Sequence, residues 1–146
     1  MGTVVKPRAA SPAAQAWELY RKVFAAHQPR FMRICASFEL SKQQVFALQL
    51  LDPERPVAMS ELAEAMFCDN SNITGIVDRL EDRGLVERRG APRDRRVKMV
   101  ALTPEGSELR ERVLERISEP PPELARLSVE DQRALRDILR RALNRA

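Results

Sequence analysis

The sequence has few residues of the kinds that enzymes, secreted proteins and membrane proteins depend on. It contains one histidine and two cysteines in 146 residues, and no apolar run approaches the roughly 20 residues that span a bilayer. It also lacks a glycine-rich phosphate loop, a nucleophile elbow and a two-histidine metal motif. Two cysteines make no disulfide framework, which is typical of a reducing compartment. We therefore expect a cytoplasmic protein that is not an enzyme, with no catalytic residues, no metal site and no cofactor.

The charge is nearly balanced overall but is unevenly distributed. Lysine and arginine total 25 against 21 acidic residues, which gives a net charge of +4, and 32% of the residues are charged. The segment from Arg83 to Lys98, however, contains seven basic residues and only two acidic ones. A short segment with such a local excess suits a polyanionic partner.

The N-terminal part predicts a short tail and two helices. Residues 1–10 lack the apolar stretch of a signal peptide and are expected to form a flexible tail. Ser11 and Pro12 are typical of a helix start, and Pro29 should kink or break that helix near Gln28. Ser41 with Gln44 forms a capping box that opens the next helix. Residues 11–38 are thus assigned to the first long helical segment.

The central part predicts two short helices followed by a β-hairpin. Val57–Met59 suits a short strand, Ser60 is expected to cap one helix, and Asp69 to cap another that runs to about Arg83. Gly84 then stands at a helix end, and two strands are expected at 85–88 and 97–102 around an arginine-rich tip. This order of elements predicts a helix-turn-helix with a hairpin wing over residues 41–103.

The C-terminal part predicts further amphipathic helices. Thr103 and Pro104 repeat the start signal, a triple proline at 120–122 should end that helix, and Ser128 caps the last one. The last helix carries an apolar stripe at Leu135, Ile138, Leu139 and Ala142. The predicted fold is therefore mainly α with a small β-hairpin wing, a winged helix-turn-helix whose terminal helices, including residues 104–146, form a dimerisation lobe.

The second central helix has a buried stripe and a polar outer face. Ile73, Ile76, Val77 and Leu80 recur at helical spacing, so the side chains opposite them should face outward. Small hydroxyl and amide groups suit close approach to base edges, although such residues also simply cap and solvate surface helices. The candidate DNA-reading residues of this helix are Asn70, Ser71, Asn72, Thr74, Gly75 and Arg79.

Three central segments resemble the MarR family of transcriptional regulators. They are SELAEAM at 60–66, ITGIVDRLEDRGLV at 73–86 and DRRVKMVALT at 94–103. The resemblance implies a homodimer that binds double-stranded DNA at a palindromic operator, with helix 70–83 in the major groove and wing 88–98 in the minor groove. It further implies that Asp94 orients Arg96, and that a small apolar or aromatic effector releases a repressor. One departure is Gly75, which stands where many relatives carry arginine.

The wing supplies a second set of candidate residues. Its candidate DNA contacts are Arg89, Arg93, Asp94, Arg95, Arg96 and Lys98. Two alternatives stay open: a nonspecific architectural DNA-binding protein, and a dimerisation domain related to small-molecule methyltransferases. We interpret Cys35 and Cys68 as structural residues, since a reactive thiol needs positively charged surroundings. We interpret His27, a lone imidazole on the apolar face of the first helix, as structural too.

Overall fold

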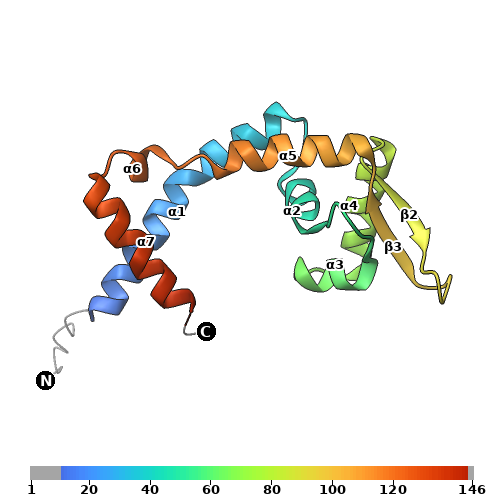
Figure 1. Ribbon diagram of the computed structural model, residues 1–146, viewed down its shortest axis with the longest axis horizontal. Helices are drawn as coiled ribbons and strands as arrows, with labels where there is room; N and C mark the ends of the chain where they lie inside the picture. The colour runs from blue at the N-terminus through green and yellow to red at the C-terminus, as the bar shows by residue number, and fades with distance from the viewer. Residues whose placement is uncertain (1–10, 145–146) are drawn as a thin grey trace, which may run out of the picture. The chain divides into compact units, whose positions relative to one another are not determined.

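The computed structural model describes residues 11–144, which divide into two compact units. The central unit is Phe31–Glu119, and the terminal unit combines the residues up to Arg30 with those from Pro120 onward. Figure 1 shows the elements of both units along the chain. The tail predicted at residues 1–10 lies outside the described residues.

The described chain is mainly helical and has one small sheet. Helix α1 (Pro12–Ser37) begins in the terminal unit and ends in the central one. The central unit then contains α2 (Lys42–Leu50), β1 (Val57–Ala58), α3 (Met59–Ala65), α4 (Asn70–Asp82), β2 (Val86–Gly90), β3 (Lys98–Leu102) and α5 (Pro104–Ser118). The terminal unit adds α6 (Pro122–Ala125) and α7 (Val129–Leu143). The predicted fold class is confirmed.

Most helices begin at the capping residues that the sequence predicts. Ser41 forms the full capping box with Gln44, the hydroxyl accepting from the Gln44 backbone N–H and the Gln44 side chain accepting from the Ser41 N–H. Asp69, Thr103 and Ser128 each accept a hydrogen bond from the backbone N–H three residues further on. These local contacts satisfy N–H groups that the helix itself leaves unpaired.

A kink or break was predicted at Pro29, and the break is wrong. Helix α1 continues through this residue to Ser37. Proline removes one backbone donor and costs about 3 kcal/mol inside a helix. Beyond it, however, Phe31, Ile34 and Cys35 are buried in the central unit, and this burial keeps the following turns helical.

The start of α3 and the bounds of the strands in the central unit also differ from the prediction. Ser60 does not cap α3, because the helix begins at Met59 and Ala58 is its N-cap residue, without a side-chain hydrogen bond. Ala58 is held extended by its pairing with Met99 in the sheet, so the strand leads directly into the helix. Strand β2 extends to Gly90 because its last residues still pair with β3.

The sheet has the order β1-β3-β2 and is antiparallel throughout. In the hairpin, Arg88 lies opposite Val100 and Gly90 lies opposite Lys98. Strand β2 is therefore an edge strand, and α4 packs beside it. This contact between helix and strand fixes how the hairpin projects from the central unit.

The core of the central unit forms around α4. The predicted stripe is confirmed, since Ile73, Ile76, Val77 and Leu80 are all buried. They belong to one cluster with residues of α2, α3, both hairpin strands and α5, including Leu48, Leu62, Val86, Val100 and Val113. Each such side chain contributes roughly 1.5 to 3 kcal/mol on burial. The outward face of α4 is thereby fixed with respect to the sheet.

The terminal unit leaves apolar side chains uncovered. No residue of α7 is buried, and Ile138 is 53% exposed. On α1, Trp17 is 62% exposed and its ring stacks on that of Tyr20, with centroids 5.6 Å apart. Within residues 11–144, no helix is both long enough and apolar enough to cross a membrane.

Candidate nucleic-acid interface

The first turn of α4 is organised by Asp69. Its Oδ1 atom accepts from the Asn72 backbone N–H and from the Ser71 hydroxyl, both at 2.8 Å. These two hydrogen bonds, the backbone one first, lower the pKa of the Asp69 carboxyl below its usual value. The carboxylate therefore holds the start of the helix across the neutral pH range.

The hydroxyl groups on this face donate to the protein itself. Thr74 Oγ1 donates to the Asn70 carbonyl oxygen at 2.7 Å, and Ser71 Oγ donates to Asp69. Each hydroxyl has a single proton, so both oxygens present only lone pairs outward. Such an oxygen accepts from exocyclic amino groups, which cytosine and adenine display in the major groove.

The amide groups of Asn70 and Asn72 are available. Both residues are exposed, and their side-chain amides make no hydrogen bond within residues 11–144. An asparagine amide can both donate and accept, as a bidentate contact to adenine requires. The outward face of α4 thus combines two amides with two acceptor hydroxyls.

The other candidates on α4 lie further along the helix. Arg79 is exposed, and Gly75 is half-buried with the Arg79 guanidinium as its nearest neighbour, 3.6 Å from where a Cβ would be. Nothing crowds the surface at Gly75. The absence of a side chain there lets another molecule approach the helix backbone closely.

The hairpin tip holds its basic side chains outward. Asp94 Oδ1 accepts from the Arg96 backbone N–H at 3.0 Å and from Arg96 Nε at 3.2 Å. The Arg96 side chain is 93% exposed, so its Nη groups face solvent while the carboxylate restrains its stem. Arg93, Arg95 and Lys98 are exposed as well, whereas Arg89 pairs with Glu87.

A groove between α4 and the wing brings part of the candidate set together. Asn70 and Thr74 line it from the helix, and Arg96 and Lys98 line it from the hairpin. The remaining candidates lie outside this groove: Ser71, Asn72, Gly75, Arg79, Arg89, Arg93, Asp94 and Arg95. Candidate base-reading groups and exposed cations are therefore neighbours on one surface.

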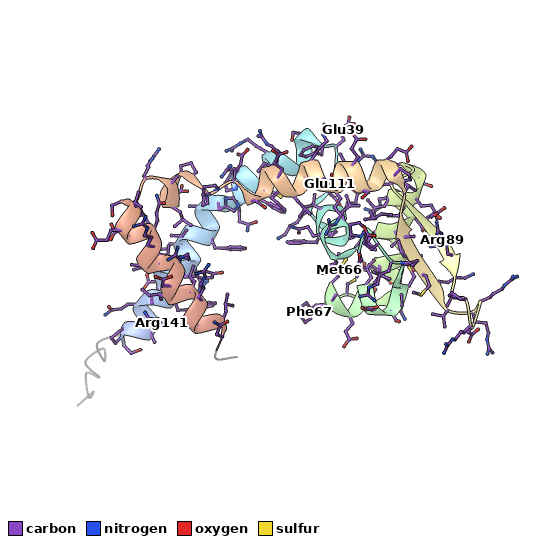
Figure 2. The ribbon with its side chains drawn as sticks, in the orientation of Figure 1. Glu39, Met66, Phe67, Arg89, Glu111 and Arg141 are labelled. Carbon is purple, nitrogen blue, oxygen red and sulfur yellow. The ribbon has the colours of Figure 1, made fainter. Side chains whose placement is uncertain are left out.

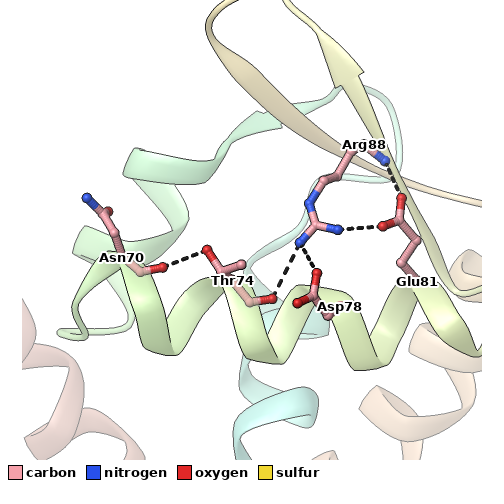
Figure 3. Close-up of polar contacts among 5 residues, drawn as sticks. All are labelled: Asn70, Thr74, Asp78, Glu81 and Arg88. Carbon is pink, nitrogen blue, oxygen red and sulfur yellow. Dashed lines mark hydrogen bonds and ion pairs between the residues drawn. The ribbon is translucent and has the colours of Figure 1, made fainter.

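The role of Arg88 was not predicted from the sequence. Its charge groups it with the basic residues of the wing, but its guanidinium turns inward to α4 (Figure 3). Nη1 lies 2.5 Å from Glu81 Oε2, and Nη2 lies 2.5 Å from Asp78 Oδ1. Burial alone would lower the pKa of Arg88, but the two carboxylates outweigh it and raise the pKa. The available signal was the i,i+3 spacing of Asp78 and Glu81, two carboxylates on one helix face that need a cation.

Two features of residues 11–144 bear on metal binding and on thiol reactivity. Within residues 11–144, no set of three histidine, cysteine or acidic residues is placed to hold a metal ion. Cys35 is buried, and this burial raises the pKa of its thiol despite the opposing effects of a backbone hydrogen bond and Lys42. A raised pKa keeps the thiol protonated and unreactive.

The elements define a class of protein. Helices α3 and α4, followed by the exposed basic hairpin β2–β3 of a three-stranded sheet, make a winged helix-turn-helix. Residues 40–98 match the model of the MarR family, so this segment is a MarR family domain. That segment holds the helix-turn-helix and most of the wing.

Individual relatives agree with this assignment. The chain is 34% identical over 93 residues to YfiV of Bacillus subtilis, an uncharacterised HTH-type transcriptional regulator, covering 64% of this chain and 58% of YfiV. It is 35% identical over 95 residues to the HTH-type transcriptional repressor NicR of Pseudomonas putida, covering 65% and 60%. The match thus spans about three fifths of each curated relative. A solved MarR family protein from Bacillus stearothermophilus superposes with a TM-score of 0.76 at 29% identity, covering 91% of this chain and 94% of that one.

Proposed function

We propose that this chain is a sequence-specific DNA-binding transcriptional regulator that acts in the cytoplasm without catalysing a reaction. The observation that carries the proposal is the groove in which Asn70 and Thr74 of α4 face Arg96 and Lys98 of the wing. Amides and hydroxyls read base edges, while exposed cations bind phosphates or enter a narrow minor groove. One surface of the central unit therefore offers both kinds of contact.

In this arrangement α4 enters the major groove and the wing lies on the adjacent minor groove. Asn70 and Asn72 bind bases through their free amides, and Ser71 and Thr74 accept from base amino groups. Gly75 admits the groove wall, and Arg79 lies on the flank. Arg96 enters the minor groove, while Arg89, Arg93, Arg95 and Lys98 contribute positive charge against the phosphates.

We further propose that the regulator is a homodimer on a palindromic operator. In a single chain, the apolar residues of α7 and of the first half of α1 are largely exposed. Their stripe at 135, 138, 139 and 142 has the spacing of a helix–helix interface. Pairing of two terminal units removes this surface from water and supplies two copies of α4 to the DNA.

Repression that a small ligand relieves is part of the same proposal. The relative NicR is named a repressor, which supports the same sign of regulation here. The central unit also has an apolar hollow beside Lys42, lined by Phe46, Leu50, Met66 and Phe67. Phe67 projects into solvent, with 98% of its surface exposed (Figure 2). An apolar surface next to one ammonium group suits a small aromatic acid, which supports the effector class.

The proposal is tested by sequencing genomic DNA fragments retained by the purified protein. We expect a shared, inverted-repeat motif, with half-sites roughly 34 to 36 Å apart along one face of the duplex. Binding to that motif should exceed binding to unrelated DNA by about a thousandfold or more. Fragments without a common motif, equally displaced by unrelated DNA, would indicate the architectural alternative instead.

Asn72→Ala provides a matched variant for this experiment. The cap of α4 uses the backbone N–H of Asn72, so the fold should keep its stability when the side-chain amide is removed. We expect a loss of about 1 to 3 kcal/mol in discrimination at one base position of each half-site. An unchanged motif would remove Asn72 from the reading face.

A further inference from the structure

Arg88 joins the wing to α4 through both its side chain and its backbone. Besides the ion pairs with Asp78 and Glu81, its Nη2 lies 3.4 Å from the Thr74 carbonyl oxygen. Its backbone N–H donates to Glu81 Oε1 at 3.1 Å. Because β2 is an edge strand, this N–H has no partner in the sheet, and Glu81 satisfies it. One residue of the hairpin is thus held at four acceptor atoms of the helix (Figure 3).

The surroundings of Arg88 distinguish it from the other arginines of the wing. Its side chain is only 25% exposed, whereas the side chains at the tip lie open to solvent. Exposed ion pairs contribute little to stability, but a planar guanidinium shared by two carboxylates and a carbonyl is geometrically restrained. The guanidinium already donates three hydrogen bonds to α4 from Nη1 and Nη2, so a DNA phosphate would compete with these acceptors for it.

We propose that Arg88 is a positioning residue that fixes the wing against α4, so that the base-reading side chains and Arg96 reach two grooves of one duplex together. This inference rests on the proposed function for its consequence in DNA binding. Its structural part, the restraint of the hairpin by the guanidinium, holds for the free protein. The two parts are therefore measured separately.

The first experiment measures hydrogen exchange of backbone amides in the free, full-length chain. Arg88→Lys keeps the charge and most of the stem, but an ammonium group cannot bridge the three acceptors as a planar fork does. We expect amides of β2 and of the tip, residues 86–98, to exchange about tenfold faster, while α2 is unchanged. Asp78→Asn, which removes one carboxylate charge and keeps its shape, should also accelerate exchange in the wing.

Arg89→Lys is the matched control for exchange. Arg89 is the next residue on the same strand, but it is exposed and pairs with Glu87 within the strand. Its replacement should leave exchange in the wing unchanged. If Arg88→Lys and Asp78→Asn both leave this exchange at the wild-type rate, the positioning role is wrong, whether or not the protein binds DNA.

The second experiment compares Arg88→Lys with Arg88→Met on the selected DNA motif. A phosphate contact would be rescued by lysine, which binds phosphate as a point charge. A positioning role is not rescued, so both variants should weaken binding by about tenfold or more, with circular dichroism reporting an intact fold. Wild-type affinity of Arg88→Lys combined with weak binding of Arg88→Met would assign Arg88 to the phosphates. Absence of any motif for the wild type would reject the proposed function and leave the exchange result standing.

Discussion

Gly106 and Leu85 are in direct backbone contact. A Cβ atom on Gly106 would lie 1.8 Å from the Leu85 carbonyl oxygen, which also accepts the Thr103 N–H at 3.1 Å. Thr103 extends the contact by donating its hydroxyl to the Gly84 carbonyl oxygen at 2.6 Å. The first turn of α5 is therefore joined to the segment that links α4 to the wing.

Gly106→Ala should destabilise the fold strongly. The added methyl group meets backbone rather than a flexible side chain, so α5 has to move away, at a cost of about 3 kcal/mol. Denaturant unfolding of both proteins measures this difference. Gly84→Ala is the control: Gly84 has φ +69° and free space around it, so only the left-handed backbone is penalised, by about 1 to 2 kcal/mol. Equal losses in the two variants would mean that the contact with Leu85 relaxes easily.

The helix starts could be predicted because capping is local. Ser41 and Asp69 each bond to a backbone N–H three residues away, so the signal lies within one turn of sequence. The predictions that were wrong depend on contacts between segments that are distant in sequence. Helix α1 passes Pro29 because residues beyond it are buried in the central unit, and α3 starts before Ser60 because Ala58 pairs with β3. Neither contact is visible in the local pattern.

Gly75→Ala should stabilise the protein while weakening DNA binding. The new Cβ lies 3.6 Å from the Arg79 guanidinium, an ordinary contact, and alanine in a helix gains about 0.5 to 1 kcal/mol over glycine. If the groove wall approaches the helix at this point, the methyl group keeps it away. Thermal unfolding and binding to the selected motif measure the two effects. A more stable variant with unchanged DNA affinity would show that the groove does not approach Gly75.

The cap at Asp69 should make stability depend on pH in acid solution. Its pKa is lowered in the folded state, above all by the Asn72 N–H and then by Ser71, relative to an unfolded value of about 3.9. The carboxylate therefore stabilises the fold above the unfolded pKa, and this contribution is lost as the pH falls through the folded pKa. Denaturant unfolding from neutral pH downward should give a shallower acid dependence for Asp69→Asn than for the wild type.

The two variants at this position separate the cap from its charge. Asparagine still accepts from the backbone through its amide oxygen, so Asp69→Asn should keep most of the neutral-pH stability. Asp69→Ala has no acceptor and should be less stable at every pH, with the same shallow slope as asparagine. If all three proteins lose stability in parallel on acidification, other carboxylates set the acid dependence.

The candidate interface could be predicted in part, because local sequence patterns determine some of its geometry and distant contacts determine the rest. The outward face of α4 follows from the 3.6-residue period of its buried stripe, and the Asp94–Arg96 contact spans two residues. The role of Arg88 depends on which face of β2 meets α4, and Asp78 lies ten residues away in sequence. Charge alone therefore groups Arg88 with the exposed arginines of the wing.

If the proposed homodimer pairs through α7, Ile138→Glu should convert it to monomers. Ile138 lies at the centre of the apolar stripe of α7 and is half exposed in a single chain. A carboxylate at this position stays in water in the monomer but is buried without a partner in the dimer, so it destabilises the dimer alone. Sedimentation should report twice the chain mass for the wild type and one chain mass for the variant. Arg133→Glu is the control, since Arg133 lies on the opposite face of α7 and should leave the dimer intact. A monomeric wild type at micromolar concentration would contradict the dimer.

Arg96→Ala should weaken operator binding by about 1 to 3 kcal/mol per half-site without affecting stability. The side chain is almost fully exposed and held only by Asp94, so its removal costs the fold little. If its guanidinium enters a narrow minor groove, replacing the flanking A·T pairs by G·C should harm the wild type more than the variant. Titrations of both proteins on the two DNA duplexes measure this interaction.

Arg93→Ala tests whether the effect at Arg96 is specific to groove shape. Arg93 is exposed at the same tip and makes no hydrogen bond or ion pair with an aspartate within residues 11–144, so we expect it to bind a phosphate. Its removal should weaken binding to both duplexes equally and reduce the salt dependence by about one unit for each phosphate that the variant no longer binds. Equal, sequence-independent losses in the two variants would make Arg96 a phosphate-binding residue as well. Full affinity in both would exclude the wing from the DNA interface and leave α4 as the reading element alone.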